Sequence, residues 1–110
     1  MKKRPSELLQ GTLDLLVLKA LEREPLHGYS ILRWLRQVSE DGLKIEEGAL
    51  YPALHRIENR GWVEAEWGLS ESNRQAKFYA LTEQGRRQLE VETHSWKSYV
   101  EAVAKILAAT

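Results

Sequence analysis

A polar stripe runs along the first, helix-like part of residues 46–67, EEGALYPALHRIENRGWVEAEW, which stops at Arg60-Gly61. Tyr51, His55 and Asn59 recur every four residues, which places them on one face of a helix, with Arg56 beside them. These side chains suit nucleic acid, because arginine pairs with guanine, asparagine with adenine, and tyrosine or histidine with phosphate or base. The stripe therefore predicts a helix whose outer face contacts DNA.

Other kinds of chemistry have little to build on in this sequence. No nucleophile motif joins Ser30, His27 and Asp41, and no glycine-rich phosphate loop is present. The three histidines lack metal-ligand spacing, and cysteine is absent. We therefore expect no enzymatic activity, no catalytic residue, no metal site and no cofactor.

The polar stripe belongs to a predicted helix over residues 47–60. Leu50, Leu54 and Ile57 lie at i, i+4 and i+7 and face the core, and Gly61 ends the helix in the left-handed conformation. The other predicted elements are a helix over 7–23, a helix over 28–40, a short strand or extended link at 43–45, strands over 62–67 and 76–81 joined by a polar loop, and a last helix from the Thr82 cap to about 108. In the helix over 28–40, Ile31, Leu35 and Val38 are expected to face the core.

The first and last helices carry more apolar surface than one small domain can cover. The segment 7–23 is leucine-rich on nearly every side, and a helix that is apolar all round is normally buried all round. In the last helix, apolar residues recur every seven positions, which is typical of packing against another helix. We therefore expect a second subunit to cover part of this surface. The residues predicted for its interface are Leu9, Leu13, Leu16, Leu89, Trp96, Val100, Val103 and Leu107.

The order of the predicted elements is that of a winged helix-turn-helix protein, mainly α with a small β-hairpin. We assign residues 1–81 to a DNA-binding winged helix-turn-helix domain and residues 82–110 to a C-terminal dimerisation helix. In this arrangement the third helix enters the major groove of DNA. The hairpin, called the wing, lies near the backbone or the minor groove.

Four motifs in this order resemble the PadR-type transcriptional regulators over essentially the whole chain. They are GTLDLLVLKAL (11–21), HGYSI (27–31), GALYPALHRIENRGW (48–62) and RQAKFYALTEQGRRQL (74–89). With one C-terminal helix, the chain is similar to the short subgroup of this family. The resemblance implies a homodimer whose C-terminal helix packs against the partner, including the partner's N-terminal helix.

The resemblance also implies which residues contact DNA. The family's pattern maps onto Tyr29, Tyr51, His55, Arg56, Arg74 and Lys77 of this sequence, and the polar stripe adds Asn59. We expect His55 and Arg56 to contact bases and Tyr29, Arg74 and Lys77 to contact phosphates. The expected function is a repressor on a near-palindromic operator, with half-sites one helical turn apart, roughly 34 Å.

Trp96 has two interpretations. It lies in the middle of the seven-residue repeat, so it is either part of the apolar core of the dimer interface or one wall of a gap between the subunits. A planar aromatic or cationic compound would stack in such a gap. The resemblance allows the second interpretation, because some short PadR-type proteins respond to drugs or phenols.

The overall charge leaves a second function open. Sixteen basic and sixteen acidic residues give a formal net charge of zero, whereas DNA-binding domains are usually basic. Glu46, Glu47 and Glu58 lie around the predicted recognition helix. The alternative is a winged-helix module that binds another protein. No apolar run is long enough to span a bilayer, and the lack of cysteine favours the cytoplasm.

Overall fold

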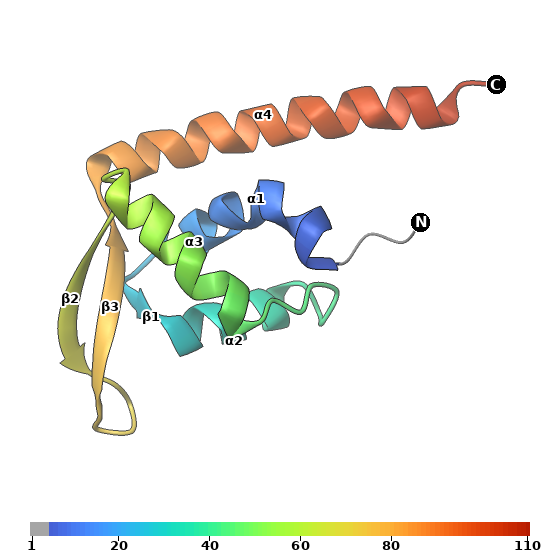
Figure 1. Cartoon of the computed structure of the whole chain (residues 1–110). Coiled ribbons are helices and arrows are strands. Elements are labelled where there is room, and N and C mark those ends of the chain that lie inside the picture. The colour runs from blue at the N-terminus through green and yellow to red at the C-terminus, as the bar shows by residue number, and fades with distance from the viewer. Residues whose placement is uncertain (1–4) are drawn as a thin grey trace.

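The computed structural model describes the backbone of residues 5–110 and the side chains from Thr12 onward (Figure 1). Leu9, which was predicted to lie in the dimer interface, falls outside the described side chains. The elements are α1 (Pro5–Ala20), β1 (Leu26–His27), α2 (Gly28–Val38), α3 (Glu47–Asn59), β2 (Val63–Leu69), β3 (Gln75–Leu81) and α4 (Glu83–Ala108). This is the mainly α winged-helix arrangement predicted from the sequence, which is thereby confirmed.

The core lies where α1, α2 and α3 pack together against the base of the hairpin. Leu50, Leu54 and Ile57 are buried in it, as the helical spacing predicted. The other large core side chains are Leu13, Val17, Leu18, Leu21, Ile31, Leu32, Leu35, Ile45, Val63, Tyr79, Leu81 and Leu89. The prediction for Val38 was wrong: its side chain is 61% exposed, because α2 ends at this residue and the chain turns away from the core.

The sheet has one more strand than the hairpin that was expected. β1 pairs antiparallel with β3, with Leu26 opposite Tyr79 and His27 opposite Phe78, and the strand order is β1-β3-β2. A strand of two residues is too short to show an alternating pattern, so no strand was predicted at residues 26–27. Residues 43–45 form an extended link, one of the two predicted possibilities.

The end of α3 is closed by a left-handed glycine. Gly61 has φ 78°, and its backbone N–H donates to the carbonyl of Glu58 at 3.0 Å. The N–H of Trp62 donates to the carbonyl of Ile57, also at 3.0 Å. This pair of hydrogen bonds is the Schellman motif, which satisfies the last carbonyls of a helix. It stops α3 and turns the chain into β2.

The start of α4 is fastened to the same turn. The hydroxyl of Thr82 donates to the carbonyl of Gly61 at 2.7 Å and accepts from the N–H of Gly85 at 3.0 Å. The N–H of Thr82 donates to the carbonyl of Trp62 at 3.0 Å. A Cβ at Gly85 would lie 1.9 Å from that carbonyl oxygen, so only glycine fits there. These contacts, the α3–α4 junction, fix the direction of α4 relative to α3.

α4 crosses the domain beside α1 and continues past it (Figure 1). Gly85 and Leu89, both near its start, are its buried residues. The side chains of Val91, Trp96, Tyr99, Val100, Ile106 and Leu107 are exposed. Among the described residues, no helix combines the length and the apolar character needed to cross a membrane.

Candidate nucleic-acid interface

The outer face of α3 carries the polar side chains that the sequence placed there. Tyr51, His55 and Asn59 are all exposed, while the opposite side of the helix is buried in the core. The amide nitrogen of Asn59 lies 3.2 Å from Nε2 of His55, so the two side chains form a pair one turn apart. The predicted helix and its polar face are therefore present, with donors and acceptors directed to solvent.

Arg56 has a different environment from the rest of the stripe. Its Nη2 lies 2.8 Å from Oδ1 of Asp14 on α1, and Nη1 of Arg60 lies 3.6 Å from Oδ2 of the same carboxylate. The side chain of Arg56 is 37% exposed and that of Asp14 is 23% exposed. Asp14 thus ties the second half of α3 to α1. The ion pair of Arg56 thus joins two different helices.

Tyr51 links α3 to the start of α2. A Cβ at Gly28 would lie 2.5 Å from the hydroxyl oxygen of Tyr51, so the phenol packs directly over the glycine backbone. Next to it, Tyr29 projects into solvent with 62% of its side chain exposed. Tyr29 and Tyr51, both predicted to contact DNA, therefore line the same cleft although they belong to different helices.

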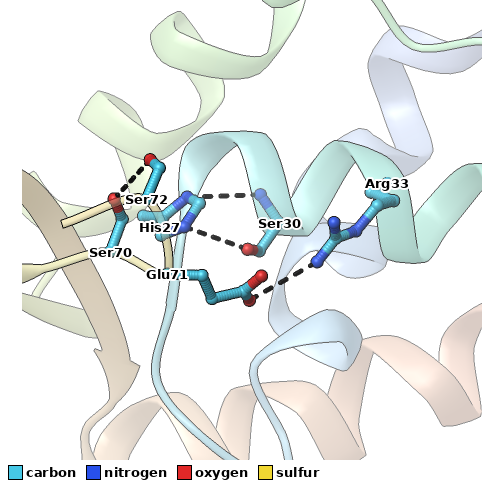
Figure 2. A network of polar contacts seen from close by, with 6 residues as sticks. All are labelled: His27, Ser30, Arg33, Ser70, Glu71 and Ser72. Carbon is cyan, nitrogen blue, oxygen red and sulfur yellow. Dashed lines mark hydrogen bonds and ion pairs between the residues drawn. The ribbon is translucent and has the colours of Figure 1, made fainter. Parts of the chain in front are cut away.

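His27 caps α2 through its contacts with Ser30 (Figure 2). Its Nδ1 accepts from the backbone N–H of Ser30 at 3.4 Å, and Nε2 lies 3.1 Å from the Ser30 hydroxyl. The neutral tautomer with its proton on Nε2 satisfies both contacts. The ring also meets Phe78 of β3 edge-on, with centroids 5.2 Å apart. This histidine therefore positions the start of α2.

The loop between β2 and β3, called the wing tip, consists of residues 70–74 and is closed by its own hydrogen bonds. Ser70 donates from its N–H to the carbonyl of Arg74 at 2.8 Å, and its hydroxyl accepts from the N–H of Arg74 at 3.3 Å. Asn73 adopts the left-handed conformation with φ 61°, which asparagine tolerates better than most residues. The wing tip thus presents Arg74, an exposed cation, on an ordered turn.

Lys77 points from the wing back toward α3. Its Nζ lies 3.7 Å from a carboxylate oxygen of Glu58 and 5.6 Å from the ring centre of Tyr79. Burial, followed by the charge of Glu58 and the neighbouring Tyr51, raises the pKa of the Tyr79 phenol above its ordinary value. The Glu58 carboxylate therefore partly neutralises the charge of Lys77 in the DNA-free protein.

A cleft of about 710 Å³ separates the start of α2 from the wing. Aromatic and cationic side chains in its lining include Tyr29, Arg33, Tyr51, Trp67, Arg74 and Lys77. Aromatic rings beside cations suit a sugar-phosphate backbone. Arg33 and Trp67 were not predicted as site residues. The spacing of Arg33 one turn after Tyr29 was a usable signal, whereas only the fold brings Trp67, 70% exposed, to the cleft.

The predicted ligand residue, Trp96, lies far from this cleft along α4. Its side chain is 44% exposed, and its ring centre is 6.2 Å from that of Tyr99. Leu13 and Leu89, predicted for the dimer interface, are 4% and 5% exposed within the protomer's own core, so they offer a partner little surface. Leu16 is half-buried, and Val100 and Leu107 are exposed.

A family model described as the transcriptional regulator PadR-like family matches residues 17–91 of the chain. The fold is similar to the PadR-family regulator from Eggerthella lenta DSM 2243, which is 35% identical, with a TM-score of 0.78 over 94% of this chain and 88% of that one. It is also similar to the PadR-like regulator from Bacillus cereus ATCC 14579, at 26% identity, with a TM-score of 0.79 over 94% and 99% of the two chains.

A relative in Streptomyces fradiae, a 37.1 kDa protein of transposon TN4556, is 46% identical over 82 residues. The match covers 74% of this chain and 22% of that protein. The chain therefore spans less than a quarter of the length of that relative.

Proposed function

This chain belongs to the PadR-like family of transcriptional regulators, and we propose that it is a repressor that binds a near-palindromic operator as a homodimer in the cytoplasm. The observation that carries this proposal is the cleft between α2 and the wing, which lies next to the exposed polar face of α3. On DNA, α3 enters the major groove with His55, Arg56 and Asn59 toward the bases. Tyr29, Tyr51, Arg74 and Lys77 hold the phosphates on either side.

The proposed dimer rests on the uncovered apolar stripe of α4. Trp96, Val100, Val103 and Leu107 recur at i, i+4, i+7 and i+11, and most of this surface faces solvent in the single chain. A contiguous apolar surface of this kind on a soluble protein marks an interaction site. A second copy supplies the complementary stripe by two-fold symmetry and sets the two α3 helices about one DNA turn apart, roughly 34 Å.

Val100→Glu is expected to convert the dimer into monomers, because it places a charge in the middle of the apolar stripe of α4. Sedimentation velocity measures the change directly. Ser98→Glu is the matched control: it adds the same charge to the exposed opposite side of α4 and should leave the dimer intact. A Val100→Glu protein that remains fully dimeric would show that the interface lies elsewhere.

Trp96 is proposed to stack against a planar aromatic ligand in a gap between the two subunits. Tyr99, 6.2 Å away on the same helix, extends the aromatic surface. A saturable quench of tryptophan fluorescence by a planar dye is expected, and Trp96→Phe should abolish it while Trp34→Phe should not. A ligand would act by shifting the angle between the paired α4 helices and so the spacing of the α3 helices. An unsaturable quench would reject the ligand role.

A second candidate function is a winged-helix module that binds a basic surface of another protein through α3. Glu46 and Glu47 are both exposed at the start of α3, and the Glu46 side chain makes no capping hydrogen bond. Carboxylates there oppose a phosphate at that helix end. Salt dependence separates the two functions, since DNA affinity falls with salt in proportion to the phosphates neutralised.

A further inference from the structure

Arg33 lies at the edge of the cleft with two partners of opposite kinds. Its guanidinium carbon sits 5.7 Å from the ring centre of Tyr29, one turn earlier on α2. On the other side, its Nη2 lies 3.6 Å from a carboxylate oxygen of Glu71 in the wing tip (Figure 2). The ion pair therefore bridges two elements that are 38 positions apart in the chain and closes one end of the cleft.

Glu71 has the opposite charge to the cationic side chains that line the cleft. Among the described side chains that line the cleft, it is the one carboxylate, and its neighbours in the lining include Arg33, Arg74 and Lys77. The wing tip that carries Glu71 is held by the hydrogen bonds of Ser70, and the carboxylate faces Arg33 of α2. A phosphate that binds in the cleft would be repelled by this negative charge.

The ion pair between Arg33 and Glu71 is exposed and can be broken easily. The side chain of Arg33 is 47% exposed and that of Glu71 is 81% exposed. Exposed pairs of this kind contribute little to stability, because water screens them and two long side chains must be ordered. The guanidinium lies near an aromatic ring, and its ion pair with the carboxylate is weak. It can therefore bind a phosphate by donating two parallel hydrogen bonds.

We propose that Arg33 is a phosphate-binding residue and that Glu71 is its intramolecular competitor. In the DNA-free protein Glu71 occupies Arg33 and ties the wing tip to α2; when DNA binds, a backbone phosphate displaces Glu71 from the guanidinium. This inference rests on the proposed DNA-binding function. Glu71 then restrains affinity for phosphate in general, so that contacts of α3 with bases decide which sequences are bound.

The test is fluorescence anisotropy with a labelled duplex of scrambled sequence, about 30 base pairs or three helical turns. Glu71→Gln is expected to bind up to about fivefold more tightly, since no exposed ion pair must be broken. Arg33→Gln is expected to bind more weakly, with the slope of log affinity against log salt reduced by about 0.9 for one lost phosphate contact. In the Arg33→Gln background, Glu71→Gln should bring no gain.

Glu64→Gln is the matched control. Glu64 is exposed on β2 and points to the other face of the hairpin, because successive side chains of a strand alternate. It removes the same charge away from the cleft and should leave affinity unchanged. Equal gains from Glu64→Gln and Glu71→Gln, or a full gain in the Arg33→Gln background, would mean that net charge alone acts and would overturn the proposal.

Two further outcomes separate this inference from the proposed function. Weaker binding by Glu71→Gln would make the ion pair a support for the wing and would overturn the competitor role, while salt-dependent binding by the wild-type protein would still uphold the DNA-binding function. Absence of salt-dependent binding by the wild-type protein would remove both proposals together.

Discussion

Replacing Gly85 with alanine is expected to lower the free energy of unfolding by about 3 kcal/mol and to move α4 away from the hairpin. The added Cβ would lie 1.9 Å from the carbonyl oxygen of Trp62. Both groups belong to backbone segments, so no change of rotamer relieves the clash. The shift would also strain the two hydrogen bonds of the Thr82 hydroxyl. Urea denaturation followed by circular dichroism measures the loss.

Gly48→Ala provides the control for this prediction. Gly48, like Gly85, lies in the first turn of its helix, and nothing lies within 4 Å of the Cβ that would be added there. Alanine is favoured over glycine inside a helix by roughly 1 kcal/mol, so this variant should be as stable as the wild type or slightly more stable. Equal losses from both substitutions would show that the α3–α4 junction does not depend on the close approach at Gly85.

Replacing Arg56 with alanine is expected to weaken operator binding by about 1–3 kcal/mol and to relax specificity at one base pair. The ion pair with Asp14 engages Nη2, and a guanidinium carries five N–H donors, so others stay available for a guanine edge. Binding of a set of single-base operator variants measures the effect. Equal weakening on all sequences would instead make Arg56 a phosphate contact or a positioning residue.

The stability role of Arg56 has to be separated from its role on DNA. Asp14→Asn weakens the same ion pair but leaves Arg56 in place. We expect it to lower stability while keeping the preference for each base of the operator, since the base-reading side chain is still present. If Asp14→Asn relaxes specificity as Arg56→Ala does, the contact between α1 and α3 positions the recognition helix and Arg56 acts through it.

The helices and the wing could be predicted from the sequence because their signals are local. Leu50, Leu54 and Ile57 have helical spacing, and all three are buried. Gly61 ends the helix in the left-handed conformation, as its residue type suggests. The motifs in the order quoted above indicated the PadR-like family, which the match over residues 17–91 confirms. Local patterns thus carried both the fold and the family.

Contacts between distant segments could not be predicted in this way. The pairing of β1 with β3 involves only Leu26 and His27, which carry no strand pattern of their own. The residue type of Gly85 does not reveal that the backbone carbonyl of Trp62 lies against it. The ion pairs of Arg56 with Asp14 and of Arg33 with Glu71 join different elements, and charge patterns along the chain do not specify such partners.

The measurement that tests the central claim most directly is binding of a labelled fragment from upstream of the protein's own gene, compared with a scrambled fragment of equal length at two salt concentrations. The account predicts tighter binding to the upstream fragment, with an affinity that falls steeply as salt rises. It also predicts that His55→Ala narrows the difference between the two fragments. No binding to either fragment at low salt would contradict a DNA-binding regulator and favour the protein-interaction module.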